Sequence, residues 1–196
     1  MCIRDRKTSI ANIIRPDASS YHTFFFDMAT NEPLRGETHQ GFSDDSSWAR
    51  GQSWAVYGLA LCYHYTHEEA ILPLFERVTK YFIDHLPEDY VPYWDLIFSD
   101  GSCEPRDTSA AAIAACGILE MEKYYHNQEF LDIAKKMMSS LSEKYTTVDY
   151  LQSNGIIKDG MYSRKHGHKS ECTSWGDYFY LEALMRMKKS DWKIYW

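Results

Sequence analysis

Residues 48–65 have the sequence WARGQSWAVYGLALCYHY, and this stretch decides the fold. After its first turn the segment is apolar on nearly every side, which is typical of a helix buried all round. Two further segments share this pattern, 108–121 (TSAAAIAACGILEM) and 174–187 (SWGDYFYLEALMRM). Residues that commonly cap helices stand at the start of each segment, and we expect caps at Ser46 or Ser47, at Asp107, and at Thr173 or Ser174.

Segments with one apolar stripe and one charged face lie between the buried ones, at residues 7–14, 72–86 and 128–145. An alternation of buried and amphipathic helices favours two concentric layers, with the amphipathic helices facing solvent. The predicted fold is therefore all-α. It is an α/α toroid, and the three outer/inner helix pairs of this chain would be half of a six-pair ring.

A small β-hairpin is expected near residues 20–36. The stretch SYHTFFFD (20–27) has the composition of a strand, and the turn-rich DMATNEPLRG (27–36) follows it. Long connections are also predicted at 88–106 and 146–173. Extended loops at one end of a helical ring are a common place for a functional site.

The composition excludes several classes of partner. A chain of 196 residues suits one domain with one core. Its formal charge of −7 gives no basic footprint for nucleic acid. No apolar run reaches the roughly 20 residues of a membrane span, so no membrane partner is expected. The five cysteines form no CxxC pair and imply no structural disulfide, which favours a reducing compartment.

The N-terminal sequence MCIRDR leads into the pattern of the last turns of a helix, with no cap before it. Residues 1–6 are therefore predicted to be non-native. Residues 7–196 are predicted to be the C-terminal half of a single toroid domain whose N-terminal half is missing. Because targeting information would be lost with that half, cytoplasmic and periplasmic locations both stay open.

Polar and aromatic groups at the start of the first buried segment suit a sugar acid. Arg50 and Trp54 share a helix face, the first with a planar fork for a carboxylate and the second with a flat ring for a sugar. Gln40 on the preceding loop adds a donor and an acceptor. The structural alternative is a buried Arg50 paired with Asp44 or Asp45 in a capping network.

Histidines and aspartates elsewhere give weaker signals. His22 on the predicted strand could be catalytic or structural. The HGH motif at 166–168 has no third ligand at a convincing spacing, so neither a metal nor another cofactor is predicted. Asp107 and Asp177 stand at the starts of buried helices, where capping is the simpler explanation.

Several blocks in series resemble the unsaturated glucuronyl hydrolases, glycoside hydrolase family 88. They are SSYHTFFFD (19–27), RGETHQG (35–41), WARGQSW (48–54), LPEDYVPYWD (86–95), RDTSAAAIAACGILE (106–120) and WGDYFYLEAL (175–184). The resemblance covers roughly residues 15–190 and is weak between the helices that begin at 128 and 174. It implies the (α/α)6 toroid, in agreement with the layer pattern.

The resemblance also implies an activity. Members of the family remove a 4,5-unsaturated uronic acid from oligosaccharides left by polysaccharide lyases. An aspartic acid protonates C4 of the vinyl ether, water adds at C5, and the hemiketal collapses. By position, His22 matches an auxiliary catalytic residue, and Gln40, Arg50 and Trp54 match substrate-binding residues, with Thr38 and Trp48 as secondary candidates.

One departure from the family pattern limits the expectation. The two essential aspartates of the family lie upstream of the stretch that begins at residue 19, and no aspartate here matches either of them. We expect this polypeptide to be inactive alone, and a half ring to expose apolar edges and be marginally stable. The expected partners are a glycosaminoglycan-derived unsaturated oligosaccharide and the missing N-terminal half.

Two alternative functions stay open. The first is an unsaturated rhamnogalacturonyl hydrolase, although WARGN is expected there and this chain has WARGQ at 48–52. The second is a catalytically dead carbohydrate-binding protein, which would bind the sugar without turnover.

Overall fold

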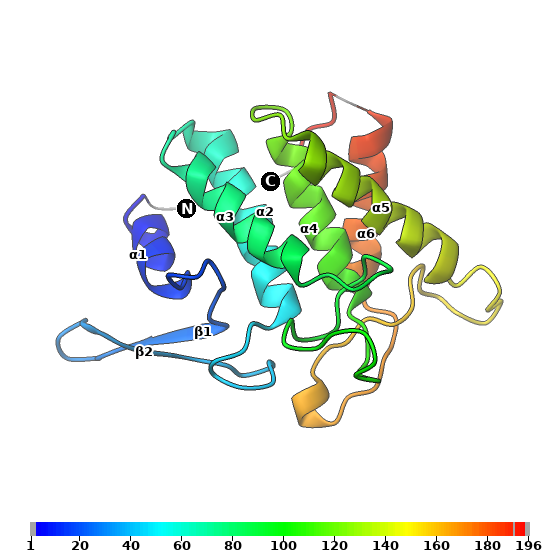
Figure 1. Cartoon of the computed structure of the whole chain (residues 1–196), viewed down its shortest axis with the longest axis horizontal. Coiled ribbons are helices and arrows are strands. Elements are labelled where there is room, and N and C mark those ends of the chain that lie inside the picture. Colours follow the sequence, from blue (N-terminus) through cyan, green and yellow to red (C-terminus); the bar gives the residue numbers. More distant parts are fainter. Residues whose placement is uncertain (1–2, 190, 195–196) are drawn as a thin grey trace.

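The computed structural model describes residues 3–189 and 191–194. Over this part of the chain the structure is helical with one small hairpin (Figure 1). The elements in order are α1 (Ile3–Ile13), β1 (Thr23–Phe26), β2 (Pro33–Glu37), α2 (Ala49–Thr66), α3 (Ile71–Asp84), α4 (Thr108–Met121), α5 (Gln128–Lys144), the 3-10 turn η1 (Arg164–His166) and α6 (Ser174–Lys188). The predicted all-α class and the predicted helices are confirmed to within two residues at their ends, except that the first helix begins at Ile3, four residues earlier than expected.

The helices form two layers around α4. Helix α4 packs between α2 and α6, and thirteen of its fourteen residues are buried. Helix α3 packs on α2, and α5 packs on α4, so these two amphipathic helices form the outer layer (Figure 1). This arrangement confirms the predicted half-toroid of inner and outer helices.

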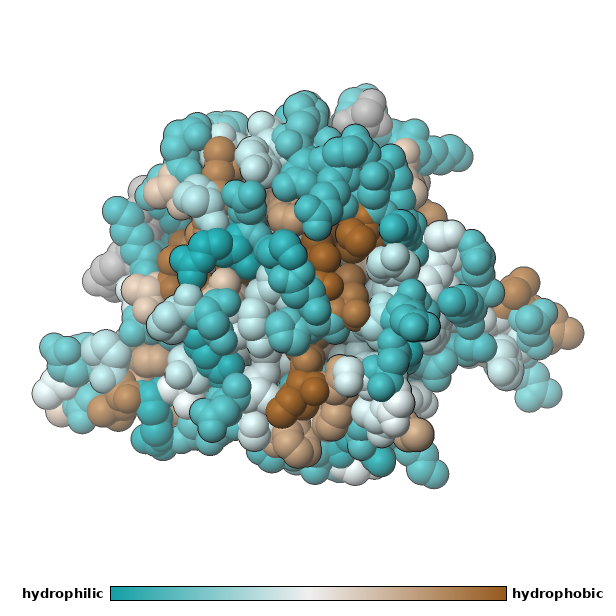
Figure 2. Space-filling model, viewed as in Figure 1, coloured by the Kyte–Doolittle hydropathy of each residue, from teal (hydrophilic) through white to brown (hydrophobic). Residues whose placement is uncertain are grey.

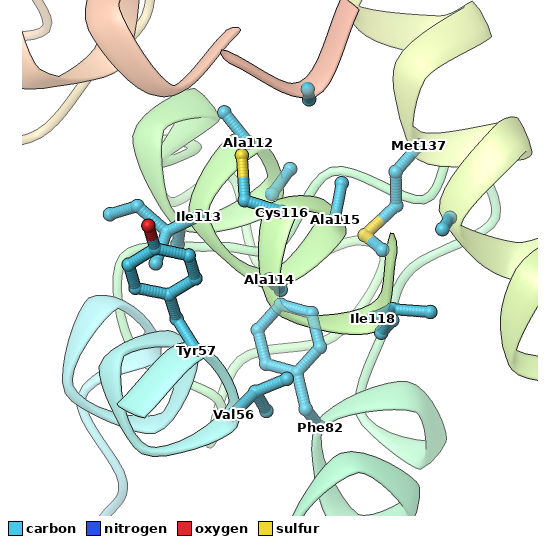
Figure 3. Packing of buried hydrophobic residues seen from close by; sticks show 14 of the residues in the cluster. Val56, Tyr57, Phe82, Ala112, Ile113, Ala114, Ala115, Cys116, Ile118 and Met137 are labelled. Carbon is cyan, nitrogen blue, oxygen red and sulfur yellow. The ribbon is translucent and has the colours of Figure 1, made fainter. Parts of the chain in front are cut away.

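The core lies between the outer helices and the inner helices (Figure 3). Phe82 of α3 and Met137 of α5 are both fully buried against the inner layer. The alanines of α4 allow close packing, and a Cβ atom at Gly117 would lie 2.8 Å from the Cα atom of Tyr57 on α2. Glycine at position 117 therefore lets the backbones of α2 and α4 lie in direct contact.

A buried ionic network joins α4 and α6 near their C-terminal ends. Arg186 lies between Glu120 and Glu182, with its Nη2 atom 2.7 Å from Glu182 Oε1. The Tyr57 hydroxyl donates to the same Glu182 oxygen at 3.0 Å. Because buried charges are tolerated only when paired, this network fixes how the three inner helices align.

Helix starts agree with the predicted caps in two cases of three. The side chains of Asp107 and Thr173 accept hydrogen bonds from the amides of Ser109 and Gly176, both at 3.2 Å. The predicted cap of α2 at Ser46 or Ser47 is wrong, because Trp48 occupies that position without a side-chain bond.

The start of α2 is satisfied by a distant loop instead. The Ala49 amide donates to the Trp94 carbonyl at 3.2 Å. The Ser46 hydroxyl donates to Asp95 Oδ2 at 2.7 Å and accepts from the Ser43 amide at 3.0 Å, so it serves the preceding loop and does not cap α2. The capping role expected of Asp177 is also wrong, since its Oδ1 accepts from the amides of Ile156 and Ile157 at 3.0 and 2.9 Å.

The predicted hairpin is present as an antiparallel β1–β2 pair, with Thr23 opposite Glu37 and Phe26 opposite Pro33. Its second strand runs one residue past the predicted end. Asp27 Oδ1 orders the turn by accepting from the amides of Ala29 and Thr30 at 2.8 Å.

The described residues also bear on the N-terminus and the cysteines. Residues 1 and 2 of the predicted non-native segment lie outside the described residues, whereas Arg6 is buried in α1 and ion-paired with Glu68 of the α2–α3 connection. The domain assignment stays a prediction.

The four cysteines at 62, 103, 116 and 172 are free thiols. No helix in the described ranges is long and apolar enough to cross a membrane.

The contact at Gly117 gives a matched pair of helix glycines to test. Gly117→Ala gains about 1 kcal/mol of helix propensity but forces α2 and α4 apart, which typically costs ~1–3 kcal/mol. Its net effect is a lower free energy of unfolding, measured by urea titration of circular dichroism. Gly58→Ala is the control, because a Cβ there meets no described atom within 4 Å, and it should be neutral or stabilising. Equal effects of the two substitutions would contradict the close contact.

Candidate functional site

The N-terminal ends of α2, α4 and α6 lie at the same end of the molecule, with the long loops around them (Figure 1). Contacts between the loops hold this end together. Residue Trp48 pairs with Asp95, and Gly160 pairs with Glu171. The Thr108 amide donates to the Asp159 carbonyl at 3.2 Å. Three helix N-termini side by side place partial positive charge around this region, which favours an anionic ligand.

Arg50, in the first turn of α2, connects the starts of two inner helices and a loop. It is buried, and its Nη1 atom lies 2.7 Å from Asp107 Oδ2 and 3.1 Å from Ser109 Oγ. Nη1 also donates to the Met161 carbonyl at 2.9 Å, and Nη2 donates to the Tyr162 carbonyl at 2.8 Å. The guanidinium group therefore fixes the loop before α6 against α4.

Two indole rings enclose the same guanidinium group. The Arg50 Cζ atom lies 4.6 Å from the Trp48 ring centroid and 5.3 Å from that of Trp175. Trp175 also donates from Nε1 to Ser109 Oγ at 3.2 Å. Cation–π contact in a desolvated site strengthens this arrangement.

The alternative in which Arg50 is buried and paired with a carboxylate is correct, but the predicted partners Asp44 and Asp45 are wrong. Asp44 and Asp45 are exposed, and Asp44 Oδ1 accepts from the Thr38 amide at 2.8 Å. The carboxylate that pairs with Arg50 is Asp107, 57 positions further along the chain. Its capping role was predicted, and its ion pair was not.

Gln40 and Thr38 lie in the loop that precedes α2. Gln40 is buried, and its Nε2 atom donates to the Tyr162 carbonyl at 2.9 Å, the same oxygen that Arg50 binds. The Thr38 hydroxyl accepts from the Gly41 amide at 2.8 Å. The loop is thereby folded tightly against the Arg50 cluster.

His22 is held in one tautomer by the backbone of the same loop. Its Nδ1 atom accepts from the amides of His39 and Gln40, both at 3.1 Å, so the ring proton resides on Nε2. The ring lies 4.3 Å from that of Trp48. Burial, followed by electrostatic repulsion from His39 and Arg50, lowers the pKa of His22 to about 4. At neutral pH His22 is therefore an uncharged hydrogen-bond donor.

Trp54 lies one turn after Arg50 and is 38% exposed, with its edge against Phe179 of α6. It lines a groove of about 510 Å³ between α1 and α2, together with His22 and Trp48. Arg50, Gln40 and Thr38 are not among the lining residues. The structure thus brings His22, Gln40, Trp48 and Arg50 into one cluster, with Trp54 as its exposed neighbour.

Three groups in this cluster were not predicted: the ion-pairing role of Asp107, the Tyr162 carbonyl, and the ring of Trp175. The sequence RDTSAA contained a usable signal. An Asp that caps a fully buried helix uses one carboxylate oxygen for the cap, and it needs a cation if its second oxygen is also buried. The other two come from loop geometry, which has no local signature. In the described ranges no three His, Cys, Asp or Glu side chains come together as a metal site.

A helical half-ring with long loops at the N-terminal ends of its inner helices places the chain in the α/α-toroid class. The family model described as Glycosyl Hydrolase Family 88 matches residues 5–190. The chain therefore belongs to glycosyl hydrolase family 88.

Curated relatives carry names from the same family. The chain is 50% identical over 194 residues to the unsaturated chondroitin disaccharide hydrolase of Streptococcus pneumoniae, covering 96% of this chain and 49% of the relative. It is 40% identical over 183 residues to the unsaturated glucuronyl hydrolase of Bacillus sp. GL1, covering 90% and 48%. The chain spans about half the length of the curated relatives it matches.

A solved structure shows the same fold. The unsaturated glucuronyl hydrolase of Streptococcus agalactiae matches with a TM-score of 0.91 at 47% identity, covering 96% of this chain and 49% of that one. An Asp-to-Asn mutant of the same enzyme, solved as a complex with dGlcA-GalNAc6S, matches with a TM-score of 0.85 at 44% identity.

The Arg50–Asp107 pair should be essential for stability. Asp107→Ala leaves a buried guanidinium group without its carboxylate, which typically costs about 3–5 kcal/mol. We expect a large fall in the urea midpoint, followed by circular dichroism. Asp45→Ala is the control and should change stability by less than ~0.5 kcal/mol, because that carboxylate is exposed. A small effect of Asp107→Ala would show that the pair is dispensable.

His22 should make stability depend on pH. Its folded pKa of about 4 lies below the value near 6.5 of an unfolded chain, so the unfolded state binds the proton first as the pH falls. Its contribution to stability is present above pH 6.5 and is lost as the pH falls towards 4. Urea midpoints at several pH values should show an acid-side loss that is smaller in His22→Gln. An identical loss in both proteins would contradict the neutral His22.

Proposed function

We propose that the whole protein removes a 4,5-unsaturated uronic acid from lyase-generated oligosaccharides by hydration of the vinyl ether, and that this chain supplies one wall of the site. Membership of family 88 supports the reaction class. The names of the relatives favour a glycosaminoglycan-derived substrate over a rhamnogalacturonan-derived one. The observation that carries the proposal is the cluster of His22, Gln40 and Arg50 beside the exposed Trp54.

In this proposal the sugar ring binds to Trp54. Its indole is the exposed ring of the cluster and stands one helical turn from Arg50, so a bound uronic acid ring stacked on it lies over the first turn of α2. Trp48 lies between His22 and Arg50 and keeps both in place. Thr38 fixes the loop that presents Gln40.

Arg50 and Gln40 form a buried polar pair behind Trp54 and do not line the groove itself. Both donate to the Tyr162 carbonyl, which ties them to the loop before α6. The charge of Arg50 is offset by Asp107. The grouped N-termini of α2, α4 and α6 therefore supply much of the attraction for a sugar carboxylate.

His22 acts as an uncharged donor to the substrate or to a catalytic carboxylate. Its pKa of about 4 and its occupied Nδ1 atom argue against a role as general base at neutral pH. The proton is delivered by aspartates of the upstream half, which the family resemblance places outside this chain.

Joining the upstream half of the Streptococcus pneumoniae relative ahead of α1 gives a full-length chimera in which to test the reaction. We expect the chimera to consume an unsaturated chondroitin disaccharide, with loss of the ultraviolet absorbance of the unsaturated sugar, and the chain alone to show no turnover. Trp54→Ala should lower kcat/KM of the chimera at least tenfold, a loss of about 1.4 kcal/mol.

Tyr65→Ala is the matched control, since this ring is 59% exposed on the same helix but near its far end. Turnover by the chain alone would overturn the proposed division of the site. Binding without turnover by the chimera would favour the carbohydrate-binding alternative. Activity on a rhamnogalacturonan-derived substrate alone would favour the other hydrolase family.

A further inference from the structure

A second pocket, of about 360 Å³, lies at the loop end of the molecule. Among the described residues it shares no lining residue with the groove beside Trp54. Three loops supply its lining: Phe42 before α2, then Trp94, Phe98 and Glu104 between α3 and α4, and Arg164 and Lys165 in η1. Figure 1 shows these loops at one end of the helices. The volume falls in the range of about 300–1,000 Å³ that is common for small-molecule sites.

Aromatic rings form one wall of this pocket. The ring centroid of Phe42 lies 5.3 Å from that of Phe98 and 6.4 Å from that of Trp94, in both cases edge to face. Trp94 is buried, whereas Phe42 is 53% exposed. The buried Asp95 fixes the backbone here, because its Oδ2 atom accepts from the Phe42 amide at 2.8 Å. The exposed phenyl ring is therefore held in place and offers a flat surface on which a sugar ring can stack.

The other lining residues of the pocket are charged. Glu104 Oε2 accepts from Trp94 Nε1 at 2.9 Å and lies 3.8 Å from Arg164 Nε. Half of the Arg164 side chain is exposed. Two cations, Arg164 and Lys165, stand against this one carboxylate, so the described lining has one net positive charge in a chain of formal charge −7. A local cation pair of this kind favours a carboxylate or a sulfate group.

We propose that this pocket is a second, non-catalytic sugar site, which binds a uronic acid or sulfated residue of an anionic oligosaccharide. The sugar ring stacks on Phe42, its anionic group lies towards Arg164 and Lys165, and Glu104 accepts from a sugar hydroxyl. An inorganic anion would make no use of the phenyl ring, and a neutral apolar ligand would make no use of the cations. The class of saccharide rests on the proposed function, but the site requires no unsaturated residue.

The backbone connects the pocket to the buried polar pair of the first site. Phe42 follows Gln40 by two residues, Arg164 follows Tyr162 by two, and Gln40 Nε2 donates to the Tyr162 carbonyl at 2.9 Å. Two residues of extended backbone span at most about 7 Å, so the pocket begins close to that pair. An oligosaccharide held in the pocket therefore stays near the groove beside Trp54, which raises its local concentration there.

The test separates the two sites by binding and by turnover in the full-length chimera described above. The binding probe is a chondroitin sulfate tetrasaccharide without an unsaturated residue, titrated by isothermal calorimetry. Phe42→Ala should raise the Kd of this probe about tenfold and leave kcat/KM for the unsaturated disaccharide unchanged. Trp54→Ala should do the reverse, with a lower kcat/KM and little change in this Kd.

Lys165→Gln tests the charge of the pocket and keeps the aromatic wall. It should raise the Kd of the probe and make that Kd less dependent on salt, because one cation is lost. Neutral maltotetraose should bind about tenfold more weakly than the sulfated probe. Equal binding of the two saccharides would overturn the anionic class of ligand.

Phe25→Ala is the matched control, because this ring is 43% exposed beside Arg35 on the hairpin, with 5.1 Å between the Arg35 Cζ atom and the ring centroid. It should change neither Kd nor kcat/KM. The same Kd in Phe42→Ala, Lys165→Gln and Phe25→Ala would overturn the proposal. So would binding by the chain alone that the chimera lacks, because another segment would then fill the pocket. An inactive chimera whose probe binding still depends on Phe42 would count against the proposed function alone.

Discussion

The buried ion pair between Arg50 and Asp107 is the constraint on which the functional end of the molecule depends. Both side chains are almost fully withdrawn from solvent, so neither charge can be left without the other. Asp107 also begins α4, and Arg50 also holds the carbonyls of Met161 and Tyr162. One interaction therefore sets the relative positions of α2, α4 and the loop before α6.

A second buried carboxylate organises the neighbouring loop in the same way. Asp95 has no exposed surface, and its Oδ2 atom accepts from the Phe42 amide at 2.8 Å and from the Ser46 hydroxyl at 2.7 Å. The polar side chains at the start of α2 are thus hydrogen-bonded inside the protein and do not form the solvent-facing side of an amphipathic helix. The face in Figure 2 mixes hydrophilic residues with several apolar patches, which lie near its centre and at the tip of the loop after α5. The polar groups that fix the site are mostly inside.

Local sequence was sufficient for the helices and insufficient for the contacts between them. The apolar pattern of 108–121 and the caps at Asp107 and Thr173 depend on residues within one turn, and these predictions are confirmed. The predicted cap of α2 was wrong, because the Ala49 amide donates to the carbonyl of Trp94 on a distant loop. The predicted partner of Arg50 was wrong for the same reason, since the prediction considered only the nearby Asp44 and Asp45. In a ring, residues at the starts of successive inner helices become neighbours, and this brings Asp107 to Arg50 across 57 positions of the sequence.

The charge state of the cluster limits the part that this chain can take in the proposed reaction. The Arg50 charge is offset by Asp107, and the low pKa of His22 leaves that ring neutral. His22 is therefore a poor proton acceptor near neutral pH, whereas both groups can orient polar partners through fixed hydrogen bonds. Hydration of a vinyl ether requires an acid strong enough to protonate carbon. In the proposed reaction, that acid is supplied from outside this chain and faces Trp54. The proposed function therefore assigns sugar binding and proton transfer to different parts of the ring.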